Sequence, residues 1–292
     1  MPNTNLPEPD AKQLAHLEDH GYYIVRGALP RDEVMEVRGV IKDHIQRPEA
    51  EAQGEQADPM DPMEDDTPAA RAARFRKLNR LGVDSPLLWS NIYLCDTLLG
   101  HARSILGDDL LVKFTSCFLK PARTGSATPW HQDNGLWRDD EVDPFNFWMA
   151  IDPAVRANGC LQFIPGSHRE PLVDHVLYPS SIHGELPREV VARAKEKYGG
   201  VHHIELQPGD AVCWHSNLFH YSPPNPSDRS RIAVAGVVSS YRTSSQTPLH
   251  KTQHWCLKGG EVCRSFPPEV YTAPGEKADT PKHQPAEEPA AV

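Results

Sequence analysis

Apolar positions in the first hundred residues recur mostly with the spacing of helices. Residues 10–19 predict a short helix that stops at His20-Gly21, and the apolar run from Tyr22 to Val25 predicts a strand. Pro30 opens a second predicted helix, residues 31–46, and residues 85–106 show helical spacing again. The expected core positions of these two helical segments are Val34, Val37, Ile41, Ile45, Leu88, Ile92, Leu98 and Ile105.

After Gly107 the pattern changes to short apolar or alternating runs, separated by Pro, Gly and Asn. Such a series predicts an all-β barrel or double sheet. One helix, residues 186–198, is expected between two of the strands. The predicted strands are 110–119, 145–152, 161–164, 201–206, 210–215 and 231–240.

These patterns indicate a single domain over residues 1–272. It would have a helical N-terminal elaboration, about 10–106, and a β core, about 107–242. Residues 47–70 are acidic and poor in large apolar side chains, so we expect a mobile loop or lid there. The Pro- and Glu-rich tail, 273–292, is expected to be disordered.

Composition excludes several classes of protein. The chain carries 40 acidic and 30 basic residues, and no basic stripe suggests a nucleic-acid partner. No apolar run approaches the roughly 20 residues that cross a bilayer, and the N-terminus has no secretory pattern. The six cysteines are scattered without zinc spacing, which is typical of reduced, buried thiols in a cytoplasmic protein.

The segment from Thr128 to Asp133 contains an H-x-D pair, His131 and Asp133. On an extended strand, residues two apart face the same side, so the imidazole and the carboxylate would converge. Two histidines and one carboxylate form the facial triad of non-haem Fe(II) oxygenases. The pair alone is a weak signal, because H-x-E matches also begin at three other histidines, which are His168, His183 and His203.

A second segment supplies further candidates. His220 is followed by Ser222, then by Asn225 in a Pro-Asn pair, and Arg231 lies eleven residues after the histidine. Between the two segments runs Asn158-Gly159-Cys160-Leu161-Gln162-Phe163-Ile164-Pro165-Gly166-Ser167-His168. Together these three ordered motifs resemble the phytanoyl-CoA dioxygenase family of Fe(II)/2-oxoglutarate oxygenases. The resemblance covers roughly residues 12 to 240.

The resemblance implies a mainly β fold with flanking α-helices, a double-stranded β-helix of the jelly-roll or cupin type. It implies Fe(II) held by His131, Asp133 and His220. It also implies 2-oxoglutarate bound by Arg231 with support from Ser222, and Lys120 can reach the cosubstrate or the substrate. A guanidinium fork suits a carboxylate at the closed end of a pocket.

The activity implied by the family consumes O2 and 2-oxoglutarate, releases succinate and CO2, and hydroxylates an unactivated C–H bond. Related halogenases carry Ala or Gly at the carboxylate ligand, so Asp133 disfavours halogenation. Desaturation and other oxidative outcomes stay open. His215 is a second choice for the distal ligand, although its spacing to Arg231 does not match the family.

The expected partner is a small organic molecule, for example a natural-product intermediate, and neither nucleic acid nor a membrane. Trp130, Trp137 and Trp148 are expected at its pocket, and Arg138 can meet an anionic group. Two other classes stay open. A jelly-roll sensor would bind metal without turnover, and a zinc-dependent hydrolase would have no need of Arg231.

Overall fold

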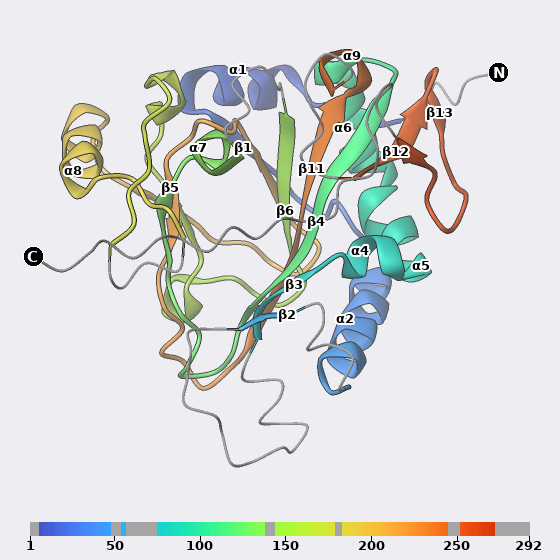
Figure 1. The fold of residues 1–292 in the computed structure, drawn as a ribbon, viewed down its shortest axis with the longest axis horizontal. Helices are drawn as coiled ribbons and strands as arrows, with labels where there is room; N and C mark the ends of the chain where they lie inside the picture. Colours follow the sequence, from blue (N-terminus) through green and yellow to red (C-terminus); the bar gives the residue numbers. More distant parts are fainter. Residues whose placement is uncertain are drawn as a thin grey trace, which may run out of the picture.

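Two antiparallel β-sheets pack face to face in the computed structural model (Figure 1), which describes residues 6–47, 54–56, 75–137, 144–178, 183–244 and 252–271. The larger sheet has the order β1 (Tyr22–Val25), β9 (Ala211–Trp214), β6 (Pro144–Ala150), β11 (Arg231–Ser240), β4 (Leu110–Lys120), β12 (Gln253–Lys258) and β13 (Glu261–Val262). In addition, β14 (Val270–Tyr271) pairs with β12, and β3 (Phe75–Asn79) pairs with β4 and with β2 (Gly54–Gln56). The smaller sheet has the order β5 (Thr128–His131), β10 (His220–Ser222), β7 (Leu161–Phe163) and β8 (His202–Ile204).

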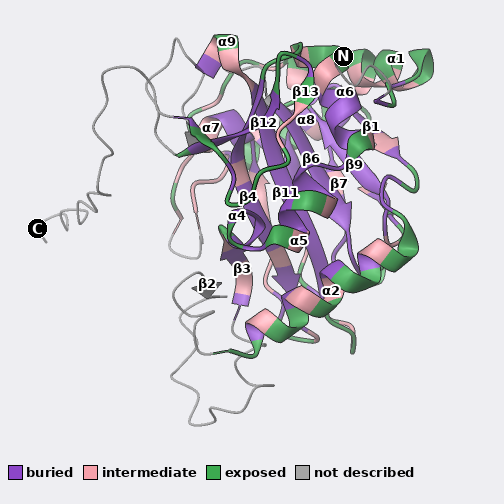
Figure 2. Cartoon of the chain, turned by 90° about the vertical axis from the view of Figure 1, so that its right-hand side faces the viewer, coloured by how far each residue is buried: buried purple, intermediate pink, exposed green. Residues whose placement is uncertain are grey.

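Helices cover the outer face of the larger sheet and flank the smaller one (Figure 1). Those on the larger sheet are α2 (Arg31–Ile45), α4 (Leu81–Asp84), α5 (Pro86–Leu88) and α6 (Asp96–Leu106). The others are α1 (Ala11–His20), α7 (Asp133–Trp137), α8 (Arg188–Lys197) and α9 (Tyr241–Ser244), with short turns η2 (Trp89–Tyr93), η3 (Arg156–Asn158) and η4 (Ser167–Arg169). In Figure 2 the buried residues concentrate in the strands, and the outward sides of the helices are exposed.

Alternation along the strands of the larger sheet produces two separate cores. On β11, Ile232 and Val234 pack in the layer between the sheet and the helices. Ala233 and Ala235 face the smaller sheet instead and pack with Trp148 of β6. Small alanine side chains leave space between the sheets, and this is where the candidate site lies.

The predicted elements agree with the structure over most of the described chain. Each predicted strand has its counterpart, and helices occur at 11–20, 31–45 and 188–197. The first helix begins with a capping box, in which Asp10 Oδ1 accepts from the Gln13 amide at 2.8 Å. It ends at Gly21, whose φ of 81° is left-handed.

One predicted helix was wrong in detail. Residues 85–106 form α5, a π-helical turn and α6 rather than one continuous helix. Leu88, Ile92 and Leu98 are buried as expected, but Ile105 is 39% exposed and does not belong to the core. The interruption shifts the phase of the helical face, so the spacing no longer predicts which side of α6 is inward.

The boundaries of the core also differ from the prediction. The N-terminal region contributes β1 and β3 to the larger sheet, and β12 to β14 extend that sheet beyond residue 242. Of the predicted lid, only 47 and 54–56 belong to the described residues, and the tail 273–292 lies outside them.

Two expectations from composition can be checked directly. Five cysteines are buried, Cys263 is partly buried, and all six are free thiols. In the described ranges, no helix is long and apolar enough to cross a membrane.

Candidate active site

The strand pairing of the smaller sheet brings two histidines together. In the antiparallel β5–β10 pair, His131 lies directly opposite His220, and their ring centroids are 3.9 Å apart. A backbone carbonyl accepts from Nδ1 of each ring, Pro129 O at 2.7 Å for His131 and Leu218 O at 2.9 Å for His220. The proton on Nδ1 leaves Nε2 of each ring as the possible metal ligand, and each Nε2 lies 3.6 Å from Asp133 Oδ1.

Asp133 reaches this point by a different route from the one predicted. His131 is the last residue of β5, and Asp133 is the first residue of α7, so a turn at Gln132 brings the pair together rather than a continuous strand. Its second oxygen, Oδ2, accepts a hydrogen bond of 3.0 Å from Trp214 Nε1 on the larger sheet. Although burial opposes ionisation, His220, His131 and the Trp214 bond together lower the pKa of Asp133.

Gln132 fixes the turn between these two residues. Its amide nitrogen donates to the carbonyls of Pro171 and Asn217, and its oxygen accepts from the Val173 amide. Its backbone N–H donates to His175 Nε2 at 3.0 Å. The side chain is fully buried, so four bonds from a buried residue hold the turn in place.

These three side chains fit a divalent transition metal. Within the described chain, His131, Asp133 and His220 form a buried group whose potential ligand atoms all lie within 4.8 Å of one another. Burial and the neighbouring His131 lower the pKa of His220 to about 4, so its ring is neutral. Two imidazoles and one carboxylate, each held by an outer hydrogen bond, are the donor set of a facial triad.

Two basic side chains, Arg231 and Lys120, line the same cavity. Arg231 begins β11 and is paired across the sheet with Lys120, the last residue of β4. The Arg231 guanidinium is 5.0 Å from the Trp148 ring centroid, and Nη1 donates to Gly159 O at 2.6 Å. Its Nε is buried and has no hydrogen-bond partner among the described residues. A buried guanidinium with an unused donor fits a ligand carboxylate.

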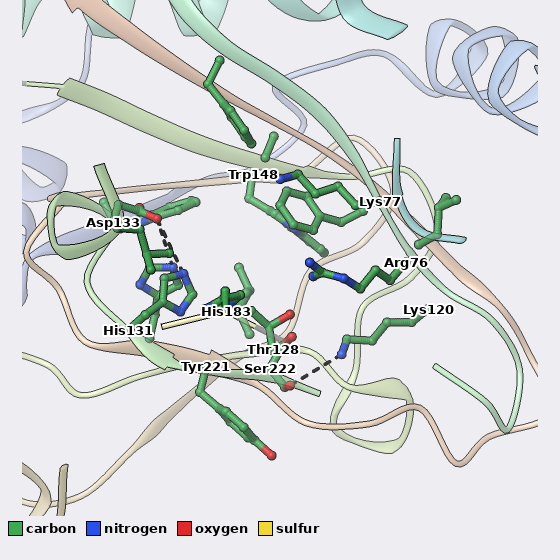
Figure 3. Close-up of a pocket in the computed structure, with 18 of the residues that line it drawn as sticks. Arg76, Lys77, Lys120, Thr128, His131, Asp133, Trp148, His183, Tyr221 and Ser222 are labelled. Atoms are coloured by element: carbon green, nitrogen blue, oxygen red, sulfur yellow. Dashed lines mark hydrogen bonds and ion pairs between the residues drawn. The ribbon is translucent and has the colours of Figure 1, made fainter. Parts of the chain in front are cut away.

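Lys120 stands beside Arg231 and is held by backbone carbonyls. Nζ donates to Ser126 O and, at 3.5 Å, to Ser222 O, which Figure 3 shows as a dashed line. Burial and the adjacent Arg231 lower the pKa of Lys120 to about 6, and burial lowers that of Arg231 to about 10. An anion bound at this position would offset the repulsion and raise the pKa of Lys120, so that both groups would carry a positive charge.

The other motif residues position these groups. Asn225 is fully buried, and its side chain donates to the carbonyls of Lys120, Pro121 and Arg229, which ties the loop before β11 to the end of β4. Gly159, which supplies the carbonyl to Arg231, has a φ of 82°. Ser167 Oγ accepts from the Phe219 amide, next to His220.

The metal group and the cations line one cavity of about 540 Å³ between the sheets (Figure 3). Of the residues predicted from sequence, it brings together His131, Asp133, His220, Ser222, Lys120, Arg231 and Trp148. Sequence reasoning did not select several other residues of the lining, which include Arg76, Lys77, Phe114, Phe118, Thr128, His183 and Tyr221. Thr128 and Tyr221 lie within two of the motifs but at positions to which the sequence assigns no role, and the others lie outside the motifs.

Of the remaining predicted pocket residues, only Trp130 has a described side chain. Trp130 precedes His131 on β5, so it faces the opposite side, where it packs against the cluster that includes Val191 of α8 and stacks on Tyr221, with ring centroids 5.2 Å apart. Trp137 ends α7 and its side chain is outside the described part, as is the whole of Arg138.

Two other histidines that the sequence offered as candidates, His215 and His168, make contacts outside the metal group. His215 is exposed and accepts a hydrogen bond from the Asn217 amide, so it does not join the metal group. His168 bonds to the Glu18 carbonyl at the end of α1 rather than within its own turn.

A jelly-roll fold enclosing a His-Asp-His group and a buried arginine defines the class of 2-oxoglutarate-dependent non-haem iron oxygenases. The chain belongs to the phytanoyl-CoA dioxygenase (PhyH) family, whose model matches residues 17–233. It is therefore an oxidoreductase of this Fe(II)- and 2-oxoglutarate-dependent type.

Two of the individual relatives share only about a quarter of their residues with the chain over the aligned region. An L-proline trans-4-hydroxylase of Streptomyces griseoviridis is 27% identical over 52% of this chain and 62% of that protein. A probable phytanoyl-CoA dioxygenase of Caenorhabditis elegans is 26% identical over 77% and 73%. EctD from S. alaskensis, solved with 2-oxoglutarate and 5-hydroxyectoine, superposes with a TM-score of 0.66 at 22% identity, over 82% of this chain and 79% of that one. At that identity the superposition establishes the fold.

Proposed function

We infer that this enzyme hydroxylates an unactivated C–H bond of a small organic substrate. One atom of O2 would enter the alcohol and the other would enter succinate, while the 1-carboxylate of 2-oxoglutarate leaves as CO2. This inference rests mainly on one cavity, which is lined both by His131, Asp133 and His220 and by Arg231. The Nε of Arg231 has no hydrogen-bond partner among the described residues and is available to a ligand.

Each residue has a definite role in this proposal. His131, Asp133 and His220 would hold Fe(II) through Nε2, Oδ1 and Nε2. When bound, the iron supplies the oxidising chemistry that couples decarboxylation of the cosubstrate to oxidation of the substrate. Arg231 would bind the distal carboxylate of 2-oxoglutarate, with Lys120 adding positive charge and Ser222 lining the same wall.

The cavity sets the size of the substrate. Its 540 Å³ lies in the range of roughly 300–1,000 Å³ that is typical of small-molecule sites. The cosubstrate would occupy part of it, which leaves space for a compact molecule and none for a folded protein domain. Phe114, Phe118 and Leu136 would provide apolar contact and exclude water from the reacting carbon. The L-proline hydroxylase among its relatives is consistent with a substrate of this size.

An anaerobic titration of the metal-free protein with Fe(II) and 2-oxoglutarate tests the first half of the proposal. We expect a visible charge-transfer band that needs both components. A substrate screen read out as succinate formation then tests the second half. A folded, iron-loaded sample that gives no band on addition of 2-oxoglutarate would contradict the proposal.

The alternatives explain less of the site. A metal sensor or a zinc-dependent hydrolase would use the His-Asp-His group but would leave the buried cations Arg231 and Lys120 without a ligand. Both alternatives predict no succinate from any substrate, so the same screen separates them from an oxygenase.

A further inference from the structure

His183 reaches the metal group because a short extended segment runs alongside β5. Glu185 and Val176 exchange two backbone hydrogen bonds of 2.8 and 2.9 Å, and the Leu186 amide donates to Trp130 O at 2.7 Å. These bonds attach residues 183–186 to the edge of the smaller sheet. The His183 ring consequently packs against His131, with centroids 5.0 Å apart and an interplanar angle of 68°.

The orientation of this ring leaves one nitrogen available. Nδ1 lies 2.7 Å from Gly184 O, and since a carbonyl can only accept, Nδ1 carries the proton. Nε2 is on the far side of the ring from this bond, and within the described ranges no hydrogen bond to it is present. His183 is part of the cavity lining, which Figure 3 shows beside His131.

A packing role alone does not account for this arrangement. An aromatic hydrocarbon would make the same edge contact with His131 without bringing a polar atom to the cavity. His183 is also not one of the three residues whose ligand atoms lie within 4.8 Å of one another. With the proton on Nδ1, the lone pair of the ring lies on Nε2, which makes this atom a hydrogen-bond acceptor.

We propose that His183 determines substrate specificity by accepting, at Nε2, a hydrogen bond from an N–H or O–H group of the primary substrate. The substrate is then a compact molecule with a hydroxyl, amide or amine donor near the carbon that is oxidised. The proposal rests on the oxygenase function inferred above. A substrate without the donor leaves a buried acceptor unpaired. We therefore expect its kcat/KM to be lower by about tenfold to a hundredfold.

The test uses matched pairs of small molecules that differ in the donor. Suitable pairs are alcohols and their methyl ethers, secondary amides and their N-methyl tertiary amides, and L-proline and its N,N-dimethyl betaine. Succinate formation with each member is measured for the wild type, His183→Phe and His183→Gln. The matched control is His203→Phe, because His203 is another H-x-E histidine and lies outside the cavity lining.

We expect the wild type to prefer the donor member of the active pair by at least about tenfold in kcat/KM. His183→Phe should lose this preference because its kcat/KM falls for the donor member and stays unchanged for the donor-free member. His183→Gln, which restores an acceptor, and the His203→Phe control should retain it. The iron–cosubstrate absorption band should be the same in all four proteins.

Other outcomes overturn the proposal in distinguishable ways. If His183→Phe keeps the preference, or loses activity equally on both members, Nε2 does not accept a hydrogen bond from the substrate. If the band itself changes, His183 acts on the metal group. Succinate from donor-free members alone would leave the oxygenase function intact and remove this inference, whereas no succinate and no band would remove both.

Discussion

Replacing Trp214 with Phe is expected to weaken metal binding, although Trp214 is not a ligand. Its Nε1–H donates to Asp133 Oδ2 at 3.0 Å. This bond orients the carboxylate so that the other oxygen, Oδ1, points toward the two histidines. Phenylalanine keeps an aromatic ring at the site but has no donor. The carboxylate would then be buried with one oxygen unpaired, and its pKa would rise because a bond that lowers it is gone.

The size of the effect follows from this bond. A hydrogen bond to a charged group contributes about 1.5–3 kcal/mol net. Loss of an outer hydrogen bond to a metal ligand typically costs roughly 10–100-fold in affinity, about 1.4–2.7 kcal/mol. The two estimates agree, so we expect Trp214→Phe to raise the metal dissociation constant roughly 10–100-fold.

Calorimetric titration of the metal-free protein with Mn(II), a redox-inert substitute, measures this constant. Trp148→Phe is the matched control, because it makes the same change in the same cavity but contacts the Arg231 guanidinium instead. We expect that variant to bind metal like the wild type and to need more 2-oxoglutarate. The reasoning is refuted if Trp214→Phe binds Mn(II) within about twofold of the wild type, or if Trp148→Phe weakens binding equally.

Arg231→Ala should raise the 2-oxoglutarate requirement far more than the iron requirement in succinate assays, and wild-type-like kinetics would remove the cosubstrate assignment. Asp133→Ala should abolish succinate formation while circular dichroism shows a retained fold, and an active variant would contradict the ligand assignment. His220→Ala should lose Fe(II) affinity and His215→Ala should keep it in parallel titrations; the reverse result would exchange their roles. Gln132→Ala should destabilise the protein by about 1–3 kcal/mol in urea unfolding, because it removes the three hydrogen bonds of a buried side chain, and an unchanged midpoint would show that the turn holds without it.

The sequence predicted the metal group because its residues belong to local patterns with fixed spacing. The H-x-D pair and the segment from His220 to Arg231 each lie within one short stretch of chain. The apolar runs were likewise sufficient to find β4, β6 and β11, since each of these strands contains several apolar residues that are buried.

Contacts between distant segments were not predictable in this way. Trp214 was only one aromatic among several until the pairing of the sheets placed its indole N–H on Asp133. His183 resembled a chance H-x-E match, and only its pairing beside β5 brings it to His131. Trp130 was expected at the pocket from its position next to His131, but adjacent strand residues face opposite sides.

The pairing of His131 with His220 has a consequence for how the protein holds together. An ion bonded to both rings and to Asp133 would link residues that are far apart along the chain, and thereby close a large loop through the catalytic core. In polymer terms it acts as a removable cross-link, comparable to a disulfide, and restricts the unfolded ensemble. Metal supply would then set the resistance of the smaller sheet to unfolding and proteolysis as well as the catalytic rate.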